Sequence, residues 1–515
     1  MKQADASPSA SRSAEHFLTN VLWSWTGVAA NLALGILLSP YMIRKLGNEA
    51  YGLWALVFSL VEYFWVLDAG LRSAVVNFVA RDLELNDRES IRSTMTTAFA
   101  VYSGVCVIAL AGTALLAVWA PGWFQISAAL QGSFRMLVLL TGSAWALSCL
   151  ALPWRAALEA HQMFPVVNRI WIGSQLFRVG GSFSVIAAGY GLEALGMVSF
   201  ACQILVGAVS IIAFHRVQPS LTISRALATR ERLRQMGRYG VHTLVSTVAQ
   251  MGIKQTQPVL IGAQMPAAFV GYFSIPSKLM EYLVDAISRV GIIANPNAAA
   301  LAARGEFGTI ARQGILLNRY CFALFAPMGI FLLVFGEGLL RVWVPSFVPF
   351  SAPLLLPLVL GTAWAVAGQY VSASLLFGLA RHAAWAWLSM GEALVLLPGL
   401  LWVLPRHGLV GAAWVSMAAM IVFRGLAVPW CLCRALQFPA PRFLLSIYTR
   451  PLLTALPVWA AAQAWSQATG WGNSWLELAV AGGAVAGVYM GAAFFTTLEP
   501  AHQRMLWSRI RRQPI

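Results

Sequence analysis

Long apolar runs dominate this chain of 515 residues and decide which environment it can fold in. Hydrophobic residues make up 59% of the chain and charged residues only 10%, whereas soluble domains have roughly 45–50% and about 25%. The apolar runs predict about fourteen membrane-spanning helices, since ~20 apolar residues cross a bilayer core. These runs begin near residues 17, 51, 94, 134, 168, 192, 239, 265, 315, 350, 384, 408, 447 and 474. The predicted fold class is an all-α polytopic membrane protein.

The positive charges lie between the apolar runs and predict the topology. The net charge is +16, and most of the 35 Lys and Arg residues fall in alternate segments. Because basic segments stay in the cytoplasm, both termini are predicted to be cytoplasmic. Charges placed in this way indicate contact with membrane lipids and exclude a nucleic-acid partner.

The largest inside segment, residues 215–238, carries six arginines and one glutamate. It is predicted to link two helical bundles, and its charge fits either a topology anchor against anionic headgroups or a regulatory site. The predicted organisation is a tail over residues 1–16, a six-helix bundle over 17–214, this linker, a second six-helix bundle over 239–432, two further helices over 433–497 and a basic tail over 498–515.

Charged residues inside the apolar runs are the strongest functional signal, because each costs roughly 2.5–3.5 kcal/mol at mid-membrane on insertion scales. The eighth run carries Lys278, Glu281, Asp285 and Arg289, at spacings of three, four and four residues. This spacing predicts one helix face that extends over about 16 Å. Such a face needs water or polar partners, so we expect it to border a cavity.

Further charges stand in other runs. The basic ones are Arg178, Lys254 and Arg424, and the acidic ones are Glu62, Asp68 and Glu392. Asp68 and Arg72 lie one turn apart and are predicted to pair. For Arg72, Arg289 and Arg424, which lie near cytoplasmic ends of runs, extension of the side chain to the headgroups is the alternative interpretation.

Glycines and prolines in the runs predict how the helices pack and bend. Gly483, Gly487 and Gly491 recur every four residues and predict close approach of a neighbouring helix. Pro258 and Pro276 each remove a backbone hydrogen bond, so they are predicted to kink or break the seventh and eighth spans.

The sequence carries no sign of catalytic chemistry. The outside loops are short, and the chain lacks paired carboxylates in a loop, a Gly-x-Ser-x-Gly nucleophile motif, a phosphate-binding loop and a His/Cys metal cluster. The six cysteines lie in or at the ends of apolar runs, as packing residues do. We therefore predict a protein that is not an enzyme and that uses neither a cofactor nor a metal.

Short motifs resemble a known family. They are Leu-Gly-Asn-Glu-Ala-Tyr-Gly-Leu-Trp at residues 46–54, Leu-Asp-Ala-Gly-Leu at 67–71, and Val-Gly-Tyr-Phe-Ser at 270–274 followed by Lys278-Leu279. The chain resembles the bacterial O-antigen flippases of Wzx type, which belong to the multidrug/oligosaccharidyl-lipid/polysaccharide exporters. The resemblance implies two bundles around a V-shaped central cavity in the bacterial inner membrane. It also implies an acid-base pair in the seventh span, where this chain has Ile253-Lys254 and lacks the acid.

The resemblance implies that the chain moves undecaprenyl-diphosphate-linked oligosaccharides across the membrane for O-antigen, capsule or exopolysaccharide synthesis, by alternating access coupled to an ion gradient. We expect Arg178, Lys254, Lys278, Arg289 and Arg424 to line the cavity and attract the diphosphate or acidic sugars. Glu62, Asp68, Glu281, Asp285 and Glu392 would balance this charge or couple transport to ions. A polysaccharide polymerase and glycosyltransferases are expected partners.

Other functions fit parts of the sequence. A cation-coupled multidrug antiporter and a lipid II flippase share the expected architecture. A membrane glycan polymerase or ligase conflicts with the short outside loops, and a structural scaffold conflicts with the charged face of the eighth span.

Overall fold

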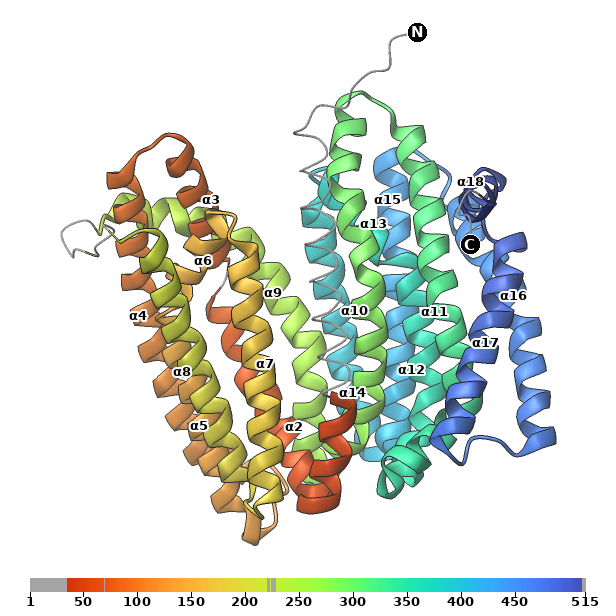
Figure 1. The fold of residues 1–515 in the computed structure, drawn as a ribbon, viewed down its shortest axis with the longest axis horizontal. Helices are drawn as coiled ribbons and strands as arrows, with labels where there is room; N and C mark the ends of the chain where they lie inside the picture. Colours follow the sequence, from red (N-terminus) through yellow and green to blue (C-terminus); the bar gives the residue numbers. More distant parts are fainter. Residues whose placement is uncertain (1–34, 69, 220–222, 224–227, 512–515) are drawn as a thin grey trace. The chain divides into compact units, whose positions relative to one another are not determined.

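A computed structural model describes residues 35–68, 70–219, 223 and 228–511 (Figure 1). Within these residues every regular element is helical and no β-strand is present. This confirms the predicted all-α fold class. The chain divides into two compact units. Unit 1 is the described part of Met1–Met251 with Met265–Ala268, and unit 2 is Gly252–Gln264 with the described part of Phe269–Ile515.

The described part of unit 1 starts with helical residues 35–46. Its further elements are α2 (Asn48–Glu62), η1 (Tyr63–Leu67), α3 (Leu71–Glu84), α4 (Arg88–Trp119), η2 (Ala120–Gly122), η3 (Ala128–Leu130), α5 (Gln131–Cys149), α6 (Leu152–Ala160), α7 (Phe164–Ala187), α8 (Leu192–Val217) and the first part of α9 (Arg230–Gln264). Local sequence explains some of the boundaries. Gly70 has φ 78°, which suits a glycine between η1 and α3, and the Asp87 carboxylate caps α4 by accepting from the Ser90 N–H at 2.9 Å.

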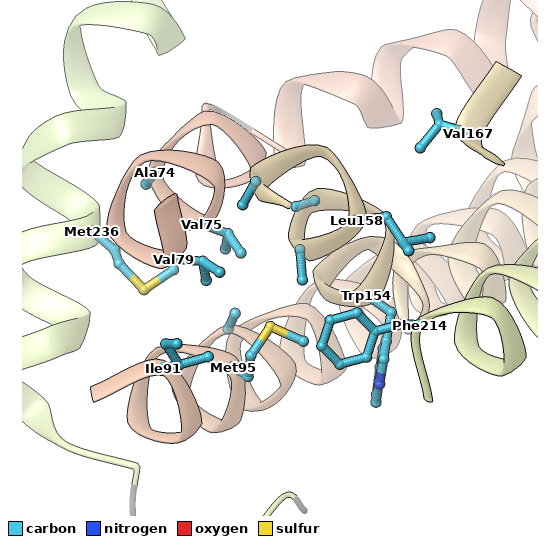
Figure 2. Packing of buried hydrophobic residues seen from close by; sticks show 14 residues of the cluster. Ala74, Val75, Val79, Ile91, Met95, Trp154, Leu158, Val167, Phe214 and Met236 are labelled. Atoms are coloured by element: carbon cyan, nitrogen blue, oxygen red, sulfur yellow. The ribbon is translucent and has the colours of Figure 1, made fainter. Parts of the chain in front are cut away.

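An apolar cluster joins α3, α4 and α6 in unit 1. Figure 2 shows Val75 and Val79 of α3 facing Ile91 and Met95 of α4. Met236 of α9 is fully buried in the same cluster. It lies in the segment 215–238, which the sequence predicted as a linker, but α9 already begins at Arg230. The second part of that segment is therefore helical and packs into unit 1.

Unit 2 contains the rest of the helices. These are the end of α9, α10 (Ala267–Ala303) from Phe269 onward, α11 (Phe307–Trp343), η5 (Pro345–Phe347), α12 (Val348–Gly368), α13 (Tyr370–Gly378), α14 (His382–Ala419), the π-helix η6 (Met420–Ala427), α15 (Val428–Leu436), α16 (Ala440–Thr469), α17 (Trp475–Thr496) and α18 (Pro500–Arg511).

Eight helices or continuous helical runs among the described residues are long and apolar enough to cross a membrane, or nine if the bent pair Ala128–Cys149 and Leu152–Ala160 forms one span. The predicted count of fourteen is therefore not confirmed. Most of the first predicted span, residues 17–40, lies outside the described residues, and α10 carries the charges noted above. The run Ala383–Leu436 is 54 residues long, and Gly408 interrupts it with φ 57° and ψ −150°. This interruption coincides with the predicted start of a span near residue 408.

The two prolines lie inside continuous helices, so the predicted helix breaks do not occur. Pro258 is within α9 and Pro276 is within α10. Pro276 has no N–H to donate to the Tyr272 carbonyl four residues earlier. The Ser351 hydroxyl of α12 donates to that carbonyl instead, at 2.7 Å. A neighbouring helix thus satisfies the backbone group that the proline leaves free.

Among the described residues, the glycine stripe of α17 (Gly483, Gly487 and Gly491) does not have the predicted close neighbour. A Cβ atom added at Gly483, Gly487 or Gly491 would meet no atom of the described residues within 4 Å. Close approach of two backbones occurs at other glycines, and Gly52 of α2 in unit 1 is an example. A Cβ atom there would lie 1.9 Å from the backbone oxygen of Ala267. Only glycine fits at this contact.

Candidate functional site

Charged side chains on α10 form an exposed face in unit 2. Lys278, Glu281 and Asp285 are all exposed, and their spacing places them on one side of the helix. The side chain of Arg289, which continues the spacing, lies outside the described residues. Exposed charges on an otherwise apolar helix need water or a polar ligand in a membrane. We call Lys254, Lys278, Glu281 and Asp285 the α9–α10 charged face.

Lys254 of α9 supplies the second helix of this face. Its Nζ atom lies 3.3 Å from Oε1 of Glu281, and the two side chains are 53% and 51% exposed. The acid that is missing beside Lys254 in sequence is thus provided by the adjacent helix α10, 27 residues later. Because both groups remain half exposed, they are accessible to solvent or to a ligand while paired.

Lys278 lies one turn before Glu281 on α10. It is exposed and has no ion-pair or hydrogen-bond partner within the part of the chain that the structure describes. An exposed ammonium group with three free donors is suited to bind an anionic oxygen. Of the predicted basic site residues whose side chains are described, Lys278 is the one that is both exposed and unpaired.

Arg178 and Glu62 belong to unit 1. Arg178 is half-buried in α7 and donates from Nη2 to Oε1 of Gln175 at 2.9 Å. Glu62 is half-buried at the last residue of α2, where the chain passes into η1. Each residue also makes an interaction with the rest of the protein. Their roles in transport stay predictions.

The ion pair predicted between Asp68 and Arg72 is absent from the described residues. Asp68 instead accepts a hydrogen bond from the Tyr102 hydroxyl of α4, and Arg72 forms an ion pair with Glu159 of α6. Glu159 also lies 3.9 Å from Nε of Arg155 in the same helix. The spacing of four residues between Arg155 and Glu159 could have predicted an ion pair within α6. It could not have predicted the pair between Arg72 and Glu159, which lie on different helices.

Glu392 of α14 and Arg424 of η6 form a buried ion pair. Nε of Arg424 lies 2.7 and 2.9 Å from the two carboxylate oxygens of Glu392. The side chains are only 10% and 4% exposed. Both residues were predicted to lie at the site. Their burial favours a structural role, because the geometry satisfies each charge with the other and leaves little surface for a ligand.

The backbone around Arg424 is tightly packed. Pro429 cannot donate to the Gly425 carbonyl, and the Tyr448 hydroxyl of α16 donates to it instead at 2.7 Å. A Cβ atom added at Gly368 of α12 would lie 2.6 Å from the Arg424 backbone oxygen. The π-helix η6 is thus held by α12, α14 and α16 together, which fixes the position of the Arg424 side chain.

A second buried ion pair was missed by sequence reasoning. Nη2 of Arg232 lies 3.1 Å from Oδ2 of Asp82, and these side chains are 13% and 2% exposed. Arg81 binds the other carboxylate oxygen at 2.8 Å. The guanidinium groups of Arg81 and Arg232 both lie over the Phe78 ring, at 5.3 and 5.5 Å. These contacts hold the start of α9 against α3 within unit 1, and Asp82 and Arg232 are too far apart in sequence to be paired by inspection.

The described residues contain no cluster of three or more His, Cys, Asp or Glu side chains that could hold a metal ion. The six cysteines are unpaired thiols, five of them buried.

Solved structures with the same fold are membrane transporters. The lipid II flippase MurJ, in an inward closed conformation, matches 93% of this chain and 98% of its own with a TM-score of 0.70 at 14% identity. A multidrug resistance MATE family transporter of the MOP superfamily, in an inward-facing conformation, matches 80% of this chain and 96% of its own with a TM-score of 0.64 at 11% identity. The chain therefore has the fold of a multi-pass membrane transporter of this superfamily.

Sequence comparison identifies the kind of transporter more closely than the fold does. Residues 41–346 match the family described as "Polysaccharide biosynthesis protein", and the chain belongs to this family. A protein of Shigella flexneri described as a candidate O-antigen transporter is 22% identical over 81% of this chain and 98% of its own length. The membrane protein EpsK of Bacillus subtilis is 22% identical over 96% of this chain and 98% of its own. These findings confirm the resemblance found in the motifs and identify a membrane transporter of the polysaccharide biosynthesis family.

Proposed function

We propose that this protein is a flippase for undecaprenyl-diphosphate-linked oligosaccharide repeat units in the bacterial inner membrane, with both termini in the cytoplasm. It would supply O-antigen, capsule or exopolysaccharide assembly, and a polysaccharide polymerase and glycosyltransferases would act before or after it. The proposal includes alternating access driven by an ion gradient. Membership of the polysaccharide biosynthesis family and the match to a candidate O-antigen transporter support this substrate class.

The observation that carries the proposal is the α9–α10 charged face. A diphosphate and a polar glycan cannot enter hydrocarbon without a large loss of hydration free energy. The exposed ammonium groups of Lys254 and Lys278 offer a polar surface on which the diphosphate can be bound. In this proposal Lys278 binds the diphosphate first, because it has no acidic partner among the described side chains.

Lys254 and Glu281 have a different role in the proposal. Their half-exposed pair can open when an anion replaces the carboxylate as the partner of Lys254. Asp285, one turn further along α10, keeps the face from becoming strongly cationic. In unit 1, Arg178 is proposed to bind the glycan or diphosphate, and Glu62 and Asp68 are proposed to balance charge.

A lipid II flippase is the second candidate, because the MurJ match extends over 93% of this chain. Both candidates move a polyprenyl diphosphate and differ in the attached sugars. A multidrug antiporter of the MATE type is the third, on fold alone.

The test is deletion of the gene in its native host, followed by analysis of surface glycan and of lipid-linked intermediates. Complementation uses the wild-type chain, Lys278→Glu, Lys278→Arg and the control Arg312→Glu, which reverses an exposed charge on α11. We expect loss of surface polysaccharide in the deletion and in Lys278→Glu, partial rescue by Lys278→Arg, and full rescue by the control. Loss of cell-wall synthesis would favour lipid II as cargo, and unchanged glycan with altered resistance to cationic dyes would favour the antiporter.

A further inference from the structure

Arg319 of α11 is a buried arginine that lacks an acidic partner. Its residue surface is only 7% exposed, and Nε donates to the backbone oxygen of Ser446 in α16 at 3.1 Å. No carboxylate of the described residues lies within ion-pair distance of it. A carbonyl satisfies one donor of the guanidinium but does not neutralise its charge. The buried Arg424 and the partly buried Arg232 each have a carboxylate partner.

The surroundings of Arg319 have an excess of positive charge. Among the described side chains, Arg450 lies on α16 one turn after Ser446, whose carbonyl Arg319 contacts, and Glu499, which follows α17, is the acidic group that acts on Arg319. Both are exposed. Two guanidinium groups thus share one distant carboxylate, and burial of a charge without a close counter-ion is unfavourable. Among the described residues, the charge of Arg319 therefore has no close counter-ion.

The cluster lies at one end of the unit 2 helices. The candidate membrane span Trp475–Thr496 ends beside this cluster, because Glu499 follows that end by three residues and contacts Tyr320, the neighbour of Arg319 in the chain. Tyr320 contacts His502 of α18, with the hydroxyl 2.8 Å from Nδ1. The Glu499 N–H donates to the same hydroxyl at 3.4 Å. The chain after α17 is thus held against Tyr320, next to Arg319, just beyond the end of a candidate membrane span.

We propose that Arg319 and Arg450 form a binding site for the phosphate of an anionic phospholipid in the adjacent leaflet. The planar guanidinium presents paired N–H donors that match two phosphate oxygens. Basic pockets between membrane helices at the headgroup level bind anionic lipids in this way. The acyl chains of such a lipid stay in the bilayer, so the site needs no apolar cavity of its own. The site serves lipid binding and is separate from the α9–α10 charged face.

The test measures lipid binding by native mass spectrometry on the purified, delipidated full-length protein. The probes are dioleoylphosphatidylglycerol, dioleoylphosphatidylcholine and inorganic phosphate. Both lipids have the same acyl chains and a phosphate diester. In phosphatidylcholine the choline group is itself cationic and competes with an arginine for the phosphate. The variants are Arg319→Gln and Arg319→Lys, with Arg442→Gln as control because Arg442 is an exposed arginine on α16.

We expect the wild type and Arg442→Gln to prefer phosphatidylglycerol at least about tenfold, which corresponds to one guanidinium–phosphate contact. Arg319→Gln should lose this preference and Arg319→Lys should keep part of it. If Arg319→Gln does not fold, Arg450→Gln replaces it and should weaken the preference. An unchanged preference in the folded variant overturns the proposal. Displacement of the lipid by millimolar inorganic phosphate would assign the site to a free anion and would overturn the lipid assignment.

Discussion

Removal of one partner from the buried Glu392–Arg424 pair should destabilise the protein strongly. In Glu392→Gln the amide replaces a carboxylate whose two oxygens lie 2.7 and 2.9 Å from Nε of Arg424. The shape of the side chain is nearly unchanged, so loss of packing is small. The main consequence is a guanidinium that stays buried without its counter-ion.

The size of the effect follows from the exposure of the pair. With side chains only 10% and 4% exposed, Arg424 cannot recover hydration when its partner is lost. Breaking a pair buried to this degree costs about 3–5 kcal/mol. The Lys254–Glu281 pair, whose side chains are 53% and 51% exposed, should be worth at most ~1 kcal/mol to stability. Glu281→Gln is therefore the matched control for the same chemical change.

The assay is denaturant unfolding of the purified full-length chain in one detergent, with each variant compared with the wild type. The double variant Glu392→Leu/Arg424→Met removes both charges and should recover most of the lost stability, since apolar replacement of a whole buried pair is close to neutral. The reasoning is refuted if Glu392→Gln unfolds at the same denaturant concentration as Glu281→Gln. It is also refuted if the double variant is less stable than the single one.

Two further predictions use contacts within a single unit. Gly52→Ala should lower the unfolding temperature, because the new Cβ would lie 1.9 Å from a backbone oxygen and overpacking costs about 1–3 kcal/mol. The control Gly487→Ala, whose Cβ would have no described atom within 4 Å, should leave the unfolding temperature unchanged or raise it. An equal decrease of the unfolding temperature in both variants would contradict the packing argument. Lys254→Glu should abolish polysaccharide export, and the exchange Lys254→Glu/Glu281→Lys should restore part of it in a surface-glycan assay. No recovery in a well-expressed exchange variant would contradict the expectation that restoring the ion pair restores export.

The sequence predicted the helical fold because each apolar run must form its own backbone hydrogen bonds in a membrane. It also predicted the face of α10, since residues three and four apart on one helix share a side whatever lies next to them. The start of a span predicted near residue 408 coincides with a break in the helix at Gly408. The break is also a local feature, because the φ of 57° at this residue favours glycine.

Contacts between helices could not be predicted from patterns within a single apolar run. Arg72 pairs with Glu159 rather than with Asp68, because the rotation of α3 against α6 decides which side chains meet. The glycine stripe of α17 is a second example. The spacing of the glycines shows that one side of the helix has no side chains, but it does not show which helix, if any, packs against that side. Lys254 gained its acidic partner Glu281 from α10 in the same way. Which side chains form a pair depends on how two helices pack against each other, and the sequence of one apolar run does not determine that packing.

The central claim is that the chain carries a lipid-linked oligosaccharide across the membrane on its α9–α10 charged face. The most direct measurement uses proteoliposomes with the purified protein and a fluorescently labelled undecaprenyl-diphosphate oligosaccharide, whose exposure is read by an external reagent that quenches the label. The wild type and Arg312→Glu should make the inner-leaflet pool accessible under an imposed ion gradient, whereas Lys278→Glu should not. Equal accessibility with Lys278→Glu, or none with the wild type, would contradict the claim.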